Sequence, residues 1–208
     1  MCKRPEAQEF MKAYDVVAGF EQRVADYAGA KYGVAVDCCT TALYLSLKYC
    51  DIRDNSFVRV PAKTYVSVPM AVIRAGGRVE FSEEKWTGLY QLWPFPIFDG
   101  AKRFRKGMYK GGLHCLSFHI KKLIPIGRGG MILTDDEAAY DWLKKARYDG
   151  REGKPYDQER IETLGWHAYM TPEQAARGLA LLDVYQDQPD QTEDYPDLRQ
   201  MPYFKEHP

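Results

Sequence analysis

The sequence predicts a single α/β domain built on a mostly parallel sheet with helices on both faces. Short apolar runs alternate along the chain with segments of helical periodicity, which is typical of crossover connections between parallel strands. With 208 residues, of which 45% are hydrophobic, the chain can bury one substantial core. We place this domain at residues 1–184 and an acidic, proline-containing tail at 185–208.

Six short apolar runs are expected to form the strands. They lie at 32–36, 57–60, 78–81, 97–99, 113–118 and 130–134. The segment 89–96 is aromatic and rich in proline, and it predicts neither a helix nor a strand.

Five segments are expected to be helices, and each has a start or stop signal. Gly29 suits the C-terminal end of the first helix, and Gly76 stops the third. Thr40 is a good N-cap for the second, acidic residues from Asp135 onward suit the start of the fourth, and Pro172 suits the start of the fifth. The helices are expected at 16–28, 40–48, 66–75, 135–148 and 172–184.

The formal net charge is zero, so no overall field indicates a partner, but the charge is unevenly distributed. Basic residues are frequent from Lys102 to Arg151, and acidic residues follow Leu182. Two interpretations stay open. In the first, these charged residues lie on ordinary solvated faces of helices. In the second, the basic residues form a positive rim around a site that receives an anionic substrate, and DNA is one such substrate.

The five cysteines have no metal-ligand spacing, so no metal site is expected. Their odd number and the lack of a signal peptide favour reduced thiols in a cytoplasmic protein. No apolar run is long enough to span a bilayer, so no membrane partner is expected.

One stretch carries the clearest chemistry. Ser117 and Lys122 lie five residues apart at the end of an apolar run, a glycine cluster follows at 127–130, and Asp99 ends an earlier run. A lysine amine can hold an aldehyde as a Schiff base, and a carboxylate at a strand end can hold a protonated ring nitrogen. This is the chemistry of pyridoxal 5′-phosphate. Each residue also has a competing interpretation. Lys122 is a surface lysine, or Lys121 is the reactive amine in its place. Asp99 ends a strand and caps the next turn.

Five blocks of sequence also resemble one family in the same order. Residues 117–130 match the pattern S-F-x-x-x-K-x-x-x-x-G-E-G-G except at its glutamate, and the other blocks lie at 20–36, 40–43, 60–67 and 165–176. The chain thus resembles the DegT family of pyridoxal phosphate-dependent nucleotide-sugar aminotransferases. The resemblance implies the large domain of the type I aspartate aminotransferase fold, a three-layer α/β domain, with the family's C-terminal small domain missing.

The departures from the family pattern lie around the expected site. Cys39 replaces a glycine, Lys102 a glutamine, Arg128 a glutamate and His167 an asparagine. The segment between 81 and 98 is also shorter than in the family. The cofactor core is therefore expected to be retained, while the surroundings that bind a sugar nucleotide are expected to be rebuilt.

The resemblance assigns the expected roles. Lys122 holds the cofactor and moves protons, and Asp99 pairs with the ring nitrogen. Thr40 and Thr41 lie at a helix N-terminus that suits a phosphate, and the resemblance adds Ser117 to them. Tyr65 is expected to stack on the ring, although core packing is equally open. Lys102 is expected to bind the cofactor, and Arg128 and His119 are expected to bind the substrate.

His167 occupies the position from which the family reaches the neighbouring subunit's cofactor, which implies a homodimer with shared active sites. A surface histidine is the alternative.

Three functions follow from these observations. The first is an aminotransferase-like enzyme that acts at the α-carbon of a small-molecule or nucleotide-linked amine. The second is a decarboxylase or lyase that acts on an amino acid attached to an anionic molecule, such as a hypermodified base in phage DNA. The third is a binding module that keeps the fold without catalysis.

Overall fold

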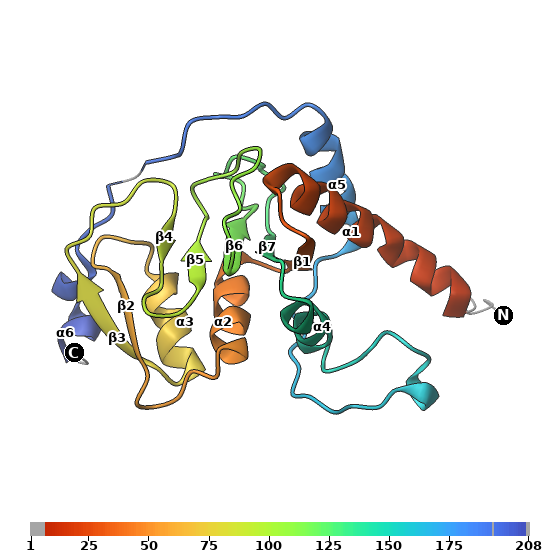
Figure 1. The fold of residues 1–208 in the computed structure, drawn as a ribbon, viewed down its shortest axis with the longest axis horizontal. Coiled ribbons are helices and arrows are strands. Elements are labelled where there is room, and N and C mark those ends of the chain that lie inside the picture. Colours follow the sequence, from red (N-terminus) through yellow and green to blue (C-terminus); the bar gives the residue numbers. More distant parts are fainter. Residues whose placement is uncertain (1–6, 193, 207–208) are drawn as a thin grey trace.

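The computed structural model of the protein describes residues 7–192 and 194–206, with side chains from Tyr14 onward. The helices and strands alternate as the sequence predicts, and Figure 1 shows their arrangement. The strands are β1 (Tyr32–Val36), β2 (Phe57–Pro61), β3 (Arg78–Ser82), β4 (Tyr90–Gln91), β5 (Ile97–Asp99), β6 (Leu113–Ser117) and β7 (Gly130–Thr134). The helices are α1 (Ala7–Ala28), α2 (Cys39–Tyr49), α3 (Ser67–Ala75), α4 (Glu137–Ala146), α5 (Pro172–Asp183) and α6 (Pro202–Glu206). Two short 3₁₀ helices lie at Tyr156–Gln158 and Leu198–Gln200.

The strands form two hydrogen-bonded groups that meet side by side. One sheet has the order β1-β7-β6-β5-β4, and β2 pairs with β3. Arg59 in β2 joins the groups through an antiparallel bridge to Trp93, just after β4. The combined order is therefore β3-β2-β4-β5-β6-β7-β1, in which β4 and β7 run against the other strands. The expected predominance of one strand direction is present, and β4 is the strand that the sequence did not reveal.

Helices cover both faces of this sheet. On one face α2, α3 and α4 pack on the strands, and on the other α1 packs on β1 and α5. Side chains of β1 alternate between the two sides, because Val34 and Val36 belong to the first core and Ala35 to the second. The expected three-layer α/β architecture is confirmed.

The N-terminus of α2 differs from the expectation by two residues. The amide of Ala42 donates to the carbonyl of Cys38 at 3.0 Å, which makes Cys38 the N-cap, and Cys38 has an extended backbone. Thr40 therefore lies in the first turn of the helix, and the prediction that it is the N-cap was wrong.

Residues 185–206, with 193 outside the described part, form a segment that we call the strap. It leaves the end of α5, crosses one side of the molecule and ends in α6 beside β3 (Figure 1). Phe204 of α6 packs edge-on against Phe81 of β3, with ring centroids 5.3 Å apart. The acidic tail predicted from the sequence thus lies on the α/β domain.

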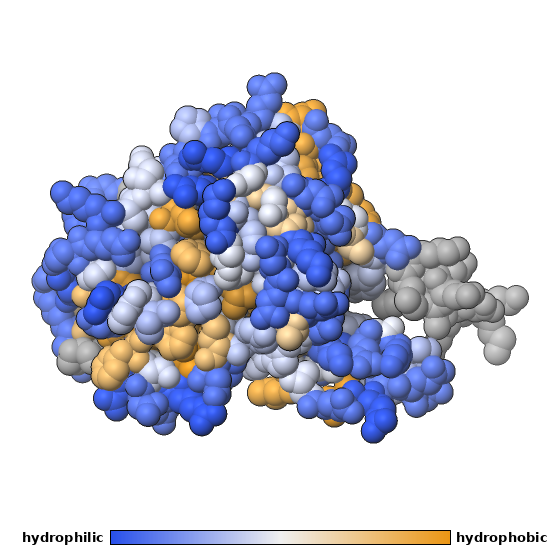
Figure 2. All heavy atoms as spheres, in the orientation of Figure 1, coloured by the Kyte–Doolittle hydropathy of each residue, from blue (hydrophilic) through white to orange (hydrophobic). Residues whose placement is uncertain are grey.

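Figure 2 shows hydrophilic side chains over much of the face seen in Figure 1, with smaller apolar areas between them. None of the helices in the described ranges combines the length and apolarity needed to cross a membrane.

Candidate functional site

A cleft lies where β5 and β6 end and α2 begins. It has a volume of about 750 Å³. Eight of the ten site residues predicted from the sequence line it, namely Thr40, Tyr65, Asp99, Lys102, Ser117, His119, Lys122 and Arg128. Parallel strands place their carboxyl ends at one edge of a sheet, which is why Asp99 and Ser117 meet there.

Asp99 is the last residue of β5 and is 6% exposed. Its Oδ1 accepts a hydrogen bond from the amide of Ala101 at 2.9 Å, and its Oδ2 accepts one from the hydroxyl of Tyr90 at 2.8 Å. Tyr90 is held in turn by Thr64, at 2.6 Å between the hydroxyl oxygens. Burial raises the pKa of Asp99, although the positive charges of Lys122 and Lys102 oppose that rise. A cationic ligand at this carboxylate would therefore stabilise its ionised form.

Lys122 reaches the cleft from a tight turn after β6. Its amide donates to the carbonyl of His119 at 2.8 Å, which reverses the chain. The side chain is half-buried, whereas Lys121 lines the same cleft and is exposed. The structure brings both candidate amines to the cleft and places the charge of Lys122 close enough to influence Asp99.

The first turn of α2 forms one wall of the cleft. Amides in a first turn have no partner within their helix, and the side chain of the N-cap Cys38 makes no capping hydrogen bond. Gly130 at the start of β7 lies so close that a Cβ there would be 2.6 Å from the amide nitrogen of Cys39. This glycine lets the strand approach the helix terminus, where backbone amides suit an anion.

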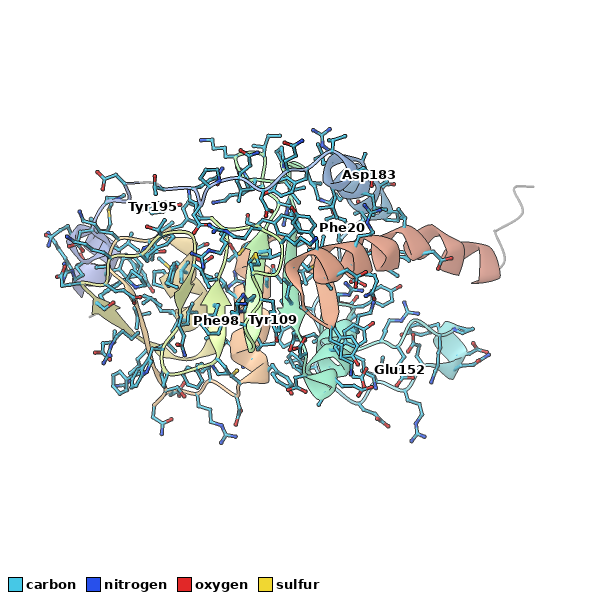
Figure 3. All side chains as sticks on the ribbon, turned by 45° about the horizontal axis from the view of Figure 1, so that its top comes forward. Phe20, Phe98, Tyr109, Glu152, Asp183 and Tyr195 are labelled. Atoms are coloured by element: carbon cyan, nitrogen blue, oxygen red, sulfur yellow. The ribbon has the colours of Figure 1, made fainter. Side chains whose placement is uncertain are left out.

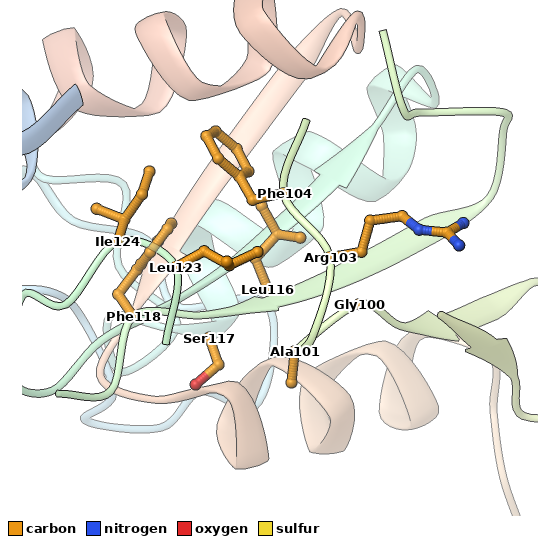
Figure 4. A pocket seen from close by; sticks show the side chains of 9 residues that line it. All are labelled: Gly100, Ala101, Arg103, Phe104, Leu116, Ser117, Phe118, Leu123 and Ile124. Carbon is orange, nitrogen blue, oxygen red and sulfur yellow. The ribbon is translucent and has the colours of Figure 1, made fainter. Parts of the chain in front are cut away.

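Ser117 adds a hydroxyl to this wall. In Figure 4 its side chain points away from the apolar group formed by Phe104, Phe118 and Ile124. Thr41 does not line the cleft, and its hydroxyl lies 3.2 Å from the thiol of Cys38.

Arg128 lies at the cleft, but its charge is already paired. Its guanidinium contacts the carboxylate of Asp37 at 2.6 Å, and its side chain is 67% exposed. Lys102 is 6% exposed and places its ammonium 5.5 Å from the ring centroid of Tyr195. His119 is exposed at the rim.

His167 lies away from the cleft of its own chain. Its Nδ1 is 2.9 Å from the carboxylate of Asp149, and its side chain is 71% exposed. The structure therefore does not bring His167 together with the other predicted residues.

Several residues of the site escaped the sequence analysis. Trp86 lines the cleft and carries no motif. Tyr90 is buried behind the cleft, where it contacts Asp99, and it belongs to the segment that predicted no element. Gln191, Thr192 and Tyr195 come from the strap, far along the chain from the motifs. No local sequence signal could have found them, because the tertiary fold brings them to the cleft. Among the residues that the structure describes, no cluster of three or more acidic, histidine or cysteine side chains could hold a metal ion.

Comparison with known proteins identifies the family. Residues 3–87 and 105–197 match the sequence profile of the DegT/DnrJ/EryC1/StrS aminotransferase family. The chain belongs to this family. The membership that the motifs indicated is thereby confirmed.

Relatives in the DegT/DnrJ/EryC1/StrS family are distant and longer. A GDP-perosamine synthase from Caulobacter vibrioides is 27% identical over 210 residues, covering 80% of this chain and 56% of its own length. The spore coat polysaccharide biosynthesis protein SpsC of Bacillus subtilis is 23% identical over 222 residues, covering 82% of this chain and 57% of its own length. The chain therefore spans little more than half the length of these relatives.

Solved structures share the fold. A DegT DnrJ EryC1 StrS aminotransferase from Brucella abortus superposes with a TM-score of 0.72 at 20% identity, over 86% of this chain and 62% of that one. The sugar aminotransferase CalS13 from Micromonospora echinospora gives a TM-score of 0.71 at 16% identity, over 88% of this chain and 67% of that one. The predicted large-domain fold is thus confirmed.

Proposed function

We propose that the protein is a pyridoxal phosphate-dependent, aminotransferase-like enzyme that acts at the α-carbon of an amine substrate. The observation that carries this proposal is the convergence of Asp99, Lys122 and the α2 N-terminus in one cleft. Membership of an aminotransferase family supports it.

The residues of the cleft fit this cofactor. The buried carboxylate of Asp99 favours a cationic partner, which a protonated ring nitrogen provides. The first-turn amides of α2 suit a phosphate, together with the hydroxyls of Thr40 and Ser117. Tyr65 lines the cleft with 56% of its surface exposed, so its ring is available for stacking.

When bound, pyridoxal phosphate supplies a ring that accepts electrons from a bond at the substrate α-carbon. Asp99 would keep the ring nitrogen protonated, and Tyr90 and the amide of Ala101 fix the direction of its carboxylate. Lys122 would hold the cofactor through Nζ. After the substrate amine has displaced it, the freed Nζ amine would carry a proton to or from the substrate carbon.

For the substrate we propose a small-molecule or nucleotide-linked amine. Relatives of this chain are named GDP-perosamine synthase and UDP-4-amino-4,6-dideoxy-N-acetyl-beta-L-altrosamine transaminase. These names motivate the nucleotide-linked class of substrate. Lys102 adds a buried positive charge to the cleft, and Arg128 adds one that Asp37 neutralises in part. A negatively charged group on the substrate is therefore expected to contact the Lys102 side.

A homodimer with shared sites belongs to the same proposal. His167 is exposed and outside its own cleft, as a residue that serves a partner's cleft must be. We also propose a cytoplasmic location. The four cysteines in the described residues are free thiols, which is the state that a reducing compartment maintains.

The test is cofactor trapping. The purified protein is mixed with pyridoxal phosphate, its visible absorption is recorded, and borohydride reduction followed by peptide mass mapping locates the modified lysine. We expect trapping on Lys122 in the natural protein, its loss in Lys122→Ala and its retention in the matched variant Lys121→Ala. A colourless protein with an unmodified Lys122 would refute the proposal and favour the binding module.

The reaction is then read from products. Transfer of nitrogen from an amino donor to a keto sugar supports an aminotransferase. Release of carbon dioxide without nitrogen transfer would instead support the decarboxylase, and retardation of duplex DNA at low salt would indicate a DNA-linked substrate.

A further inference from the structure

The strap is fixed on both sides of the cleft, and between the two anchors it supplies part of the cleft wall. Figure 3 shows Tyr195 on this segment, well removed from Asp183 at the end of α5. Gln191, Thr192 and Tyr195 line the same cleft as Asp99 and Lys122.

The first anchor is Asp190. Its side chain is 8% exposed and forms ion pairs with Arg103, at 2.6 Å, and with Arg105. The carboxylate rests against Gly88, where a Cβ would collide with it and where φ is +73°. The loop before β4 is therefore shaped to receive this aspartate. Next to it, the amide of Gln191 donates to the carbonyl of Lys102 at 2.9 Å.

The second anchor lies beside β2 and β3. The amide of Leu198 donates to the carbonyl of Ala62 at 2.9 Å, and the Leu198 side chain is buried. Phe204 then packs on Phe81. The strap is thus tied down on either side of Tyr195.

Tyr195 is held by three side chains of the cleft. Its ring centroid lies 6.3 Å from that of Trp86 with the planes at 16°, and 6.2 Å from that of Tyr65. The ammonium of Lys102 lies over the same ring. Trp86 in turn contacts Tyr90, at 4.6 Å between centroids, and Tyr90 binds Asp99. The rings of Tyr195, Trp86 and Tyr65 therefore form an aromatic wall of the cleft, and Tyr90 behind it connects Trp86 to the carboxylate of Asp99.

We propose that Tyr195 is a specificity-determining residue, which limits the bulk of the amine that can reach Lys122. Because the strap is anchored on both sides, the backbone at Tyr195 cannot retreat without breaking the Asp190 or Leu198 contacts. The contacts with Trp86, Tyr65 and Lys102 hold the ring itself. An amine that is compact next to its α-carbon fits beside the wall, and one that is bulky at that carbon collides with it. A nucleotide attached further from the amine is not limited by this contact. This inference rests on the proposed function, since it concerns the substrate of the same cleft.

The test compares two amines on the cofactor-loaded protein. L-alanine and L-tryptophan are each titrated while the visible absorption of the bound cofactor is followed, and the initial absorption change at each concentration gives an apparent affinity. Pocket walls discriminate between side chains by roughly 10–200-fold. We expect Tyr195→Ala to raise the affinity for tryptophan relative to alanine by about tenfold, which corresponds to about 1.4 kcal/mol.

Two matched variants sharpen the result. Tyr195→Phe keeps the ring and is expected to keep the natural preference, and Tyr156→Ala removes a tyrosine that is 83% exposed and outside the cleft. An unchanged tryptophan-to-alanine ratio in Tyr195→Ala, or an equal change in Tyr156→Ala, would overturn the inference.

A second readout needs no cofactor. In hydrogen exchange of the cofactor-free protein, the amides of Gln191 and Leu198 are expected to be protected, and Asp190→Asn is expected to speed exchange at Gln191. Exchange at unprotected rates at both amides of the natural protein would show that the strap does not hold Tyr195 in place. Failure to trap a cofactor on Lys122 would refute the proposed function but leave this exchange result standing, so the two failures are distinguishable.

Discussion

Glu21 is a buried charge whose removal should measurably weaken the fold. It projects from α1, is 4% exposed, and accepts hydrogen bonds from the amide of Ala35 at 2.8 Å and from Lys144 at 3.0 Å. Arg147, itself 8% exposed, pairs with the same carboxylate. This cluster ties α1 and α4 to β1, so it connects both faces of the sheet.

The change Glu21→Gln keeps an acceptor for Ala35 but leaves Arg147 without its counter-charge. Breaking a buried ion pair by removing one partner costs about 3–5 kcal/mol. For a domain of this size, each kcal/mol lowers the melting temperature by about 2–4 °C. We therefore expect the melting temperature to fall by roughly 6–20 °C. Lys144 contributes less because its side chain is 32% exposed and can be rehydrated.

The assays are thermal unfolding and urea unfolding of the cofactor-free protein, both followed by circular dichroism. Burial alone would raise the pKa of Glu21, but Arg147 and Lys144 lower it below the usual 4.5. A depressed carboxylate pKa stabilises the fold above the unfolded-state pKa, and that contribution is lost as the pH falls through the folded-state pKa. The difference between the natural protein and Glu21→Gln should therefore be full at pH 7 and shrink below about pH 4.5.

A matched control comes from an exposed pair of the same kind. Glu80 contacts Arg59 at 3.0 Å, but their side chains are 47% and 42% exposed, so Glu80→Gln should cost less than about 1 kcal/mol. If Glu21→Gln loses no more stability than Glu80→Gln, the reasoning from burial is refuted.

Three further changes test the cleft. Burial raises the pKa of Asp99, so its ionised form opposes folding at neutral pH, above the unfolded-state value of 3.8. Asp99→Asn removes that penalty but weakens the hydrogen bonds that the carboxylate accepts from Tyr90 and Ala101. Stability at pH 7 should therefore change by no more than about 1 kcal/mol, whereas cofactor binding should weaken in an absorption titration. Gly130→Ala should cost about 1–3 kcal/mol in urea unfolding, because its Cβ would press on Cys39, and full stability would contradict that crowding. Mixing Lys122→Ala with His167→Ala subunits should restore about a quarter of natural activity if sites are shared across a dimer. No restoration would count against shared sites.

Local patterns were sufficient to predict most of the fold. The strand at 97–99 and the helix from Pro172 follow from apolar runs and cap signals that act over a few residues. The start of α2 could not be placed from propensity alone, because Thr40 is a better capping residue than Cys38. The carbonyl of Cys38 nevertheless accepts the first helical hydrogen bond, and the backbone of Gly130 packs closely against the backbone of Cys38 and Cys39.

The sequence by itself determined the family, because five blocks match the family pattern in the same order. It also placed Asp99 and Ser117 at the ends of apolar runs and Lys122 five residues after Ser117. Only the tertiary structure decided their surroundings. It showed that Asp37 pairs with Arg128 and neutralises its charge in part, that Tyr90 orients Asp99, and that Tyr195 lines the cleft. These partners lie between 9 and 91 residues apart in sequence or come from the strap, and no local pattern encodes such contacts. They depend on which strand ends and loops the packed sheet brings to one edge.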